Sequence, residues 1–446
     1  MAAVAEEKDA YRAGFERFAA AHVGSDPAWL RERRTAAIAR FVEKGLPTAR
    51  DEGWRHTPVA PLAKGHFAPA DPAARPALGA LAALPCEGRG TQLVFVNGRL
   101  SREHSVLDPG EAGVVVASLR ELLREAPERL EPWLGRVADG RTGVFSDLNT
   151  AFAEDGAVVL LAPGTVAKEP ILVAHVSAGD GAPAVSYART LVVAGRGSEC
   201  RIVESYVSAD GRASLANAVT EVVVEDNAFV DRYKLQQEGA DALHVATLAA
   251  CLSRDARFSD HSIALGAALS RNDIDVRFEA EGGDCVLNGL FVLDGRRVAD
   301  THSRIDHAKP HCSSRQLYKG IVDGQARGVF NGLVLVRPGA QKTDAAQTNR
   351  NLLLSREALV HSTPQLEILA DDVKCKHGST TGQLDPVALF YLCSRGLGEA
   401  AARSLLTWAF ASDVVRKMEI EPLRRTVERH LQAHLPGVAD LAEAQP

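Results

Sequence analysis

CVLNGLFVLDG, residues 285–295, and VFNGLVLVRPG, residues 329–339, are two short apolar runs that each end at a Gly-containing turn. β-Branched and aromatic residues between turn residues are typical of a β-strand. The triplet Asn288-Gly289-Leu290 recurs as Asn331-Gly332-Leu333, which is 43 residues later. We interpret this spacing as two rungs of a parallel β-helix, a repeat architecture of stacked short strands. A large two-sheet sandwich is the alternative.

Similar runs fill the middle of the chain. They are AVVLLA, ILVAHVS, TLVVAG, CRIVESYVS, TEVVVED, HVATLAACLS and IDVRFEAEG. Ordinary sandwiches rarely continue in this way over more than about 200 residues, which favours the β-helix. We therefore predict a mainly β protein, with a β-helix core at 151–382 between a mainly helical N-terminal domain, 1–150, and a helical C-terminal domain, 383–446.

The C-terminal domain has clear helix signals. Asp385-Pro386 begins a helix that Gly396 ends. On the next helix, apolar residues form two adjacent stripes, a surface wider than one core contact usually needs. Its members include Leu406, Trp408 and Phe410.

Composition excludes several classes of protein. The chain has 446 residues and a formal net charge of -6, whereas nucleic-acid-binding domains are usually basic. It has no apolar run long enough for a membrane span and a charged N-terminus without a signal core, so we expect a cytoplasmic protein. Seven scattered cysteines without a CxxC pair indicate a reducing compartment and no self-contained zinc or cluster cage.

Catalytic motifs are also missing. The sequence contains no G-x-x-x-x-G-K-[ST] loop, no G-x-G-x-x-G and no G-x-S-x-G elbow. β-Helices often carry polysaccharide enzymes, which need paired acids, so such an enzyme is one alternative function. No spacing singles out a pair among the carboxylates of the β region: Asp273, Asp275, Asp284, Asp294 and Asp323.

DDVKCKHGST, residues 371–380, is the best candidate for a binding site. In a strand, Cys375 and His377 point to one face and Lys374 and Lys376 to the other. A thiolate and an imidazole on one face can bind a soft metal or a cluster iron. The alternative is a packed cysteine beside a surface histidine. Two ligands are too few for a closed site, so another chain or distant residues would have to complete it.

THSRIDHAKPHC, residues 301–312, is a second, weaker candidate. It contains His302, His307, His311 and Cys312 at spacings that match no standard zinc pattern. Polar residues at turns and rung edges are the simpler interpretation.

Several stretches together are characteristic of one family. They are GLPTARDEGWRHT (45–57), CVLNGLFVLDG (285–295), HCSSRQLYKG (311–320), FNGLVLVRPGAQKTDAAQTNRNLLLS (330–355), PQLEILADDVKCKHGSTTGQLD (364–385) and FYLCSRGL (390–397). In this order the chain resembles the SufB/SufD family, the iron–sulfur cluster assembly proteins of the SUF system. Gly378 and the motif around Trp54 favour its SufD branch over its SufB branch.

The resemblance implies a right-handed parallel β-helix between two helical domains. It also implies a non-enzymatic subunit of a SufBCD scaffold, which pairs with SufB through the β-helix and binds the SufC ATPase through the C-terminal domain. There we expect contacts from Leu406, Trp408, Phe410 and Tyr391. His377, with Cys375 alongside, is implied at the SufB interface, where a transient iron–sulfur cluster is built.

Other properties are expected on the same basis. No cofactor is expected to bind tightly to the isolated chain, no nucleic acid or membrane is an expected partner, and a homodimer is plausible when SufB is absent. A purely structural scaffold that binds no metal is the remaining alternative.

Overall fold

A computed structural model describes residues 2–65, 67–70, 81, 84–85, 90–107, 110–178, 183–208 and 213–434. Cys86 lies outside the described residues. The helices are α1 (Ala2–His22), α2 (Ala28–Lys44), α3 (Ala60–Lys64), α5 (Leu119–Glu125), α6 (Val144–Phe152), α7 (Pro386–Ser394), α8 (Glu399–Val415) and α9 (Glu421–His434). Short 3-10 turns lie at η1 (Val23–Ser25), η2 (Glu52–Trp54), η3 (Arg102–His104) and η4 (Pro127–Arg129). None of these described helices is long and apolar enough to cross a membrane.

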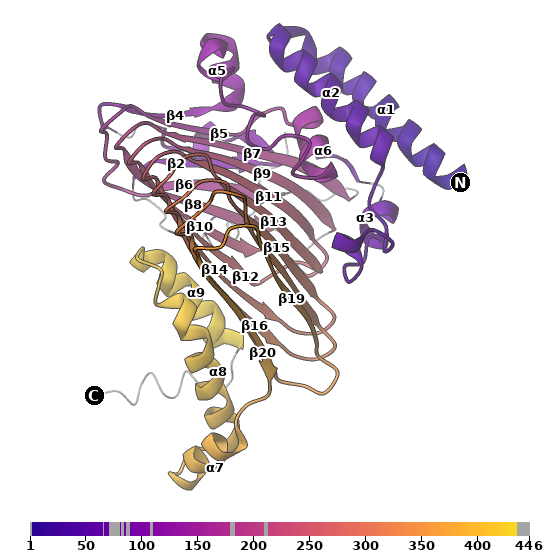
Figure 1. Ribbon diagram of the computed structural model, residues 1–446. Coiled ribbons are helices and arrows are strands. Elements are labelled where there is room, and N and C mark those ends of the chain that lie inside the picture. Colours follow the sequence, from indigo (N-terminus) through magenta and orange to yellow (C-terminus); the bar gives the residue numbers. More distant parts are fainter. Residues whose placement is uncertain are drawn as a thin grey trace.

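Two ten-stranded sheets form the body of the molecule (Figure 1). The first sheet contains β19 (Leu359–Ile368), β17 (Arg327–Val336), β15 (Val298–His307), β13 (Leu269–Phe278), β11 (Leu243–Leu252), β9 (Ser214–Val224), β7 (Ala184–Ala194), β5 (Ala157–Leu161) and β4 (Val114–Ser118) in spatial order, with β1 (Ala68–Pro69) beside β7. The second contains β20 (Lys374–Gly382), β18 (Asp344–Leu353), β16 (Ser313–Val322), β14 (Asp284–Leu293), β12 (Arg257–Ala264), β10 (Phe229–Gln237), β8 (Glu199–Ser208), β6 (Ile171–Ser177), β2 (Gln92–Val96) and β3 (Arg99–Leu100).

From β5 to β20 the chain alternates between the two sheets, and each strand pairs in parallel with the strand two places later. This is a parallel β-solenoid, as predicted, and the sandwich alternative is wrong. The interpretation of the 43-residue spacing between the two Asn-Gly-Leu triplets as two rungs is also wrong. Asn288 pairs with Leu317, so one turn takes 29 residues here, and a spacing of 43 residues corresponds to one and a half turns. Asn288 therefore lies in the second sheet and Asn331 in the first.

Side chains that alternate along the strands fill the space between the sheets. The main core cluster includes Ile202, Val230, Phe258, Leu287 and Phe330, all fully buried. Apolar residues at every second position, repeated in register from turn to turn, give a continuous core along the solenoid axis.

A charged group lies inside the same space. Arg232 is 3 % exposed and forms ion pairs with Glu204 and Asp260. Buried charges are tolerated when they are paired and hydrogen-bonded, and Thr220 supplies a further hydrogen bond to Glu204 at 2.9 Å. Burial raises the pKa of Asp260, although the guanidinium opposes this effect.

The C-terminal helices cover the outer face of the second sheet. Val414 and Met418 near the end of α8, and Leu423 on α9, are buried in one cluster with Leu290 and Ile321 of the sheet. By contrast, α7 projects beyond the sheets (Figure 1). Asp385 caps α7 by accepting a hydrogen bond from the Val387 amide, which confirms the predicted start of this helix.

The segment around Trp54 reaches back over the outer face of the first sheet. Arg271 lies over the Trp54 ring, 4.0 Å from its centroid, and donates a hydrogen bond to the Gly53 carbonyl at 2.6 Å. His56 stacks on His361 of β19 with ring centroids 3.9 Å apart. The N-terminal part of the chain therefore contacts the last strand of this sheet.

Candidate functional site

The strand β20 is the last strand of the second sheet, and it carries Cys375 and His377. Their register partners in β18 are Ala345 and Gln347, both buried between the sheets. Cys375 and His377 therefore share the inward-facing side, and Lys374 and Lys376 face outward, as the alternation predicted.

The thiol and the imidazole differ in their surroundings. Cys375 is partly buried and packs against the buried cluster of Val334, Val336, Ala340 and Ala345. This burial raises the pKa of the Cys375 thiol. His377 is exposed, because no further turn of the solenoid covers it within the described part of the chain. The ring therefore lies at the open end of the interior, where a ligand or a partner can reach it.

The opposite wall of the last turn is β19. Ser362 of β19 and Ser379 of β20 are linked across the turn by a hydrogen bond of 2.8 Å between their hydroxyl oxygens. This contact holds the two strands together two residues beyond His377.

The two ends of the solenoid differ. At the N-terminal end the sheets finish in β3, which has two residues, and β4, both antiparallel to their neighbours. At the C-terminal end they finish in β19, with ten residues, and β20, with nine. Short, irregular edges prevent further pairing, whereas long edges expose rows of unpaired N–H and C=O groups. The C-terminal end is therefore a template for another strand.

The chemistry of the last turn is that of an incomplete site. Within the described residues, no group of three or more His, Cys, Asp or Glu side chains is placed to hold a metal ion. An imidazole nitrogen fits iron as a ligand, and a thiolate fits it once its proton is lost. The geometry thus offers one accessible nitrogen and one partly covered sulfur to a site that needs further ligands.

The second candidate, residues 301–312, does not converge. His302 faces outward on β15 and contacts Asp300 at 3.0 Å. His307 faces inward, where its Nε2 is 2.9 Å from the Ser314 hydroxyl. His311 occupies a turn with a φ of 60°, and Cys312 is buried.

The carboxylates of the β region are mostly engaged in local contacts. Asp273 pairs with Arg271 at 2.7 Å and Asp275 with Arg304 at 3.0 Å. Asp284 accepts from Ser313, Asp294 lies near Arg297, and Asp323 bonds to the backbone of Gly324. These partners give each of the five a structural role.

The residues predicted to bind the ATPase fall into two groups. Trp408 and Phe410 are partly buried and pack against the cluster between α8, α9 and the second sheet. Leu406 is half-buried on the same helix. Tyr391 on α7 is 55 % exposed, together with Val387 at 72 % and Phe390 at 75 %. The predicted surplus of apolar surface on α8 is thus partly used within the chain, and the exposed apolar surface lies on α7.

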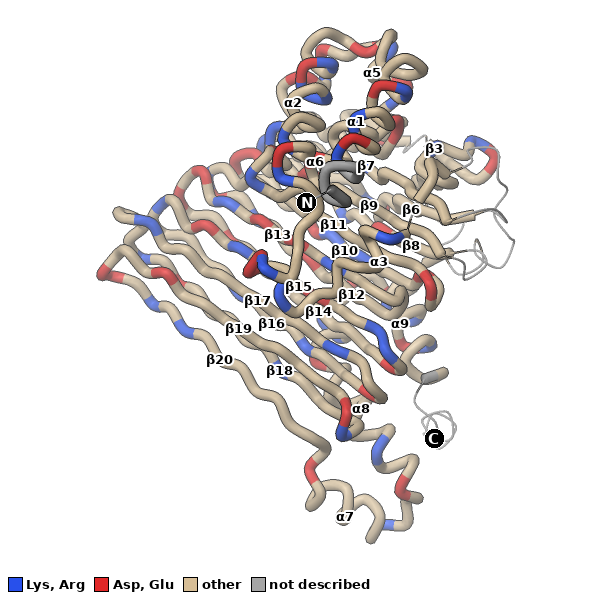
Figure 2. Tube along the Cα trace, turned by 90° about the vertical axis from the view of Figure 1, so that its right-hand side faces the viewer, with Lys and Arg blue, Asp and Glu red and all other residues tan. Residues whose placement is uncertain are grey.

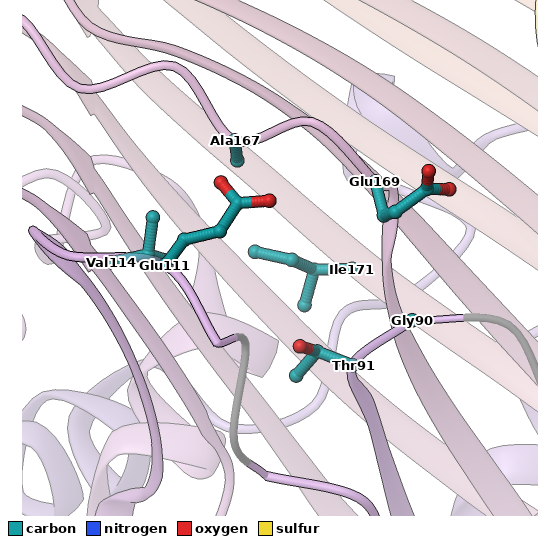
Figure 3. Close-up of a pocket in the computed structure, with 7 residues that line it drawn as sticks. All are labelled: Gly90, Thr91, Glu111, Val114, Ala167, Glu169 and Ile171. Carbon is teal, nitrogen blue, oxygen red and sulfur yellow. The ribbon is translucent and has the colours of Figure 1, made fainter.

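A pocket near the other end is a poor alternative site. Its lining residues are Gly90, Thr91, Glu111, Val114, Ala167, Glu169 and Ile171 (Figure 3). The Glu111 carboxylate accepts hydrogen bonds of 3.2 Å from the Lys168 amide, so it is already engaged. No thiol or imidazole belongs to this lining.

The fold and the last turn together define a class of protein: a β-solenoid with helical flanks, one open end and one incomplete ligand set. Comparison with protein-family models identifies the family. Residues 5–173 match the SufBD protein N-terminal region, and residues 175–410 match "SUF system FeS cluster assembly, SufBD core domain". The chain belongs to the SufBD family of iron–sulfur cluster assembly proteins.

Curated relatives support the assignment over nearly the whole length. The SufBD family protein slr0076 of Synechocystis is 34 % identical over 409 residues, which is 90 % of each chain. The iron–sulfur cluster assembly protein SufD of Escherichia coli is 31 % identical over 405 residues, 90 % of this chain and 92 % of that one. The chloroplastic protein ABCI7 of Arabidopsis thaliana is 28 % identical over 91 % of this chain and 86 % of its own length.

Two features of the site were not predicted. Phe390 lies within the quoted stretch FYLCSRGL, and its exposure depends on where α7 projects. Gln347 is paired in register with His377 on the adjacent strand, although no local pattern in the sequence connects the two residues.

Proposed function

We propose that this protein is a non-catalytic subunit of a SufBCD-type scaffold and works in the cytoplasm. Its partners are SufB and the SufC ATPase, and its cargo is the iron–sulfur cluster under construction. No cofactor is held permanently by this chain. Family membership and the similarity to SufD of Escherichia coli support the proposal, and the six described cysteines, all free thiols, agree with a reducing compartment.

The open end of the solenoid carries the proposal. Long parallel edge strands without a cover are an aggregation hazard unless a specific partner pairs with them. In the complex, SufB covers β19 and β20, so that His377 lies at the interface. In the absence of SufB, a second copy of this chain can use the same edges, and light scattering on the isolated chain measures this homodimer.

His377 supplies a neutral nitrogen ligand to iron or to the growing cluster. An imidazole suits a transient site because it binds iron and leaves when it is protonated or displaced. Cys375 has a secondary role, because its thiol is packed against apolar side chains and must first lose a proton.

SufC docks on the exposed apolar surface of α7 formed by Val387, Phe390 and Tyr391. Trp408, Phe410 and Leu406 on α8, which are only partly buried, add further contacts to SufC in this proposal. Figure 2 shows α7 and β20 at the same end of the molecule, away from α1 and α2. ATP binding to SufC alters the cluster site only if the two states of SufC bind this end differently.

The first test is reconstitution with SufB and SufC, with His377→Ala as the variant and Lys376→Ala as the matched control on the outward face of the same strand. We expect cluster yield to fall with His377→Ala and to stay unchanged with Lys376→Ala. A normal yield with His377→Ala removes the histidine from the function and leaves a purely structural scaffold.

The second test concerns α7. Phe390→Ser is expected to weaken SufC binding in calorimetry, because an exposed aromatic anchor is lost. Val166→Ser is the control, since Val166 is 54 % exposed and lies just before β6, near the other end of the solenoid. Equal SufC affinity for both variants contradicts docking on α7.

A further inference from the structure

Gln347 on β18 is the register partner of His377 on the adjacent strand β20. Its side chain reaches across the space between the two sheets to the facing strand β17. It is 1 % exposed. A Cβ added to Gly332 on the facing strand β17 would lie 2.2 Å from its Nε2 atom, so this glycine leaves the space that the amide fills. The amide therefore lies between the two sheets, directly below the open last turn.

Neither polar atom of this amide is satisfied. Both Nε2 and Oε1 of Gln347 are buried without a hydrogen-bond partner in the described part of the chain. In Gln316, the register neighbour of Gln347 on β16, Oε1 accepts a hydrogen bond from Ser303 at 2.8 Å and only Nε2 lacks a partner, whereas in Gln347 both polar atoms lack one. Buried amides are normally hydrogen-bonded because loss of their water is otherwise uncompensated. A buried, unpaired amide one strand below an exposed imidazole therefore points to a bond that forms between the two.

We propose that Gln347 is a positioning residue for His377: when the exposed imidazole rotates toward the interior, its Nδ1–H is donated to Oε1 of Gln347, and its Nε2 stays free to bind iron. Register pairing places the two side chains on the same face of adjacent strands. Nε2 of Gln347 lies against Gly332, so we assign the unpartnered Oε1 to the ring. Histidines that bind metals almost always donate their second N–H to such an acceptor, which fixes the tautomer and the ring plane.

This inference rests on the proposed function for its purpose, but its geometry can be tested without SufB, SufC or metal. The full chain is labelled with ¹⁵N-histidine, and the His377 signals are assigned with His377→Ala. The ¹⁵N shifts of the two ring nitrogens at a pH where the ring is neutral report which nitrogen carries the proton. We expect mainly the Nδ1–H tautomer in the wild-type chain.

Three variants separate positioning from packing. Gln347→Leu removes the acceptor at similar volume and is expected to shift the ring to the Nε2–H tautomer without lowering stability. Gln347→Glu keeps an acceptor and is expected to retain Nδ1–H. Gln316→Leu, one turn farther inward, is the control and leaves the tautomer unchanged. In the reconstituted complex, Gln347→Leu is expected to reduce cluster yield by about tenfold, the usual effect of losing such a partner.

The same tautomer in the wild-type and Gln347→Leu chains overturns the inference, and so does an Nε2–H tautomer in the wild type. The two proposals can also fail separately. If Gln347→Leu shifts the tautomer but His377→Ala does not lower the cluster yield, the positioning by Gln347 is correct and the proposed role of His377 in cluster assembly is wrong.

Discussion

Lys319 fixes the C-terminal helices to the solenoid, and its partners predict an asymmetric response to mutation. Lys319 lies on the outer face of β16 and is 2 % exposed. Its Nζ donates to the Asp413 carboxylate at 2.5 Å and to the Phe410 carbonyl at 2.8 Å, and lies 4.3 Å from the centroid of the Phe410 ring. Asp413, in contrast, is 58 % exposed.

Removal of either partner leaves a different group behind. Asp413→Ala leaves a buried ammonium with one carbonyl and one ring. The cost of an unpaired buried charge is ~3–5 kcal/mol, which we reduce to about 2 kcal/mol because water can enter where the exposed carboxylate was. Lys319→Met fills the same volume without charge and leaves a carboxylate that water can solvate, so the expected cost is below about 1 kcal/mol.

Hydrogen exchange measured by mass spectrometry reports this difference locally. A loss of about 2 kcal/mol corresponds to roughly 30-fold faster exchange of α8 amides if the helix opens as a unit. The double variant is expected to behave like Lys319→Met alone. If Lys319→Met speeds exchange of α8 as much as Asp413→Ala does, the lysine stabilises the interface by attraction and the reasoning from its burial is refuted.

Two further predictions concern the solenoid itself. Gly289→Ala is expected to destabilise the protein by ~1–3 kcal/mol in urea denaturation, because the new Cβ would lie 2.2 Å from the ring of the fully buried Tyr318; an unchanged midpoint would show that the ring can move aside. Acid is expected to destabilise the fold between pH 6.5 and about 4. In this window three buried histidines stay neutral in the folded state, since desolvation lowers each pKa from 6.5 to about 4, while their unfolded forms take up protons. They are His175, His261 and His307. Burial raises the pKa of Asp231 to about 7. As the pH falls, its carboxylate therefore takes up a proton in the folded state before it does in the unfolded state, and this stabilising effect cancels the destabilising effect of roughly one histidine. The net slope is about 2 kcal/mol per pH unit, and denaturation midpoints measured at pH 6.5, 5.5 and 4.5 check its sign.

The sequence predicted the solenoid from its apolar strands and missed the polar ones. Each apolar run named from the sequence overlaps a strand, but β10, β12, β15, β16, β18 and β19 were not among the strands so found. In β16 and β18 the inward positions include Gln316, Gln347 and Asn349, so hydrophobic alternation disappears where the chain is still a strand. The predicted length of a turn was wrong for a related reason. Gly289 and Gly332 each leave space for a large side chain, so the sequences around them are alike. The two glycines nevertheless lie in different sheets.

The candidate site was predicted in part. Alternation along residues 374–382 was enough to put Cys375 and His377 on one face. That this face belongs to the last, uncovered turn depends on where the following chain goes, and no local pattern contains that information. The same limit applies to α8, whose apolar surface could not be divided between the solenoid and a partner without the fold.

The connection between α7 and β20 is short, and this constrains how the proposed ATPase partner can act on the proposed cluster site. Only residues 383–385 separate the end of β20 from the start of α7. Three residues span at most about 10 Å, so a displacement of α7 beyond that distance must be transmitted to β20 or must unfold the end of one of the two elements. The helices α8 and α9 remain fixed on the second sheet through their buried apolar face and Lys319. In the proposed complex, a pull on α7 therefore reaches both β20, through residues 383–385, and α8, through residues 395–398. Because α8 is held on the second sheet, the edge strand that carries His377 is the element that such a pull can move against the body of the solenoid.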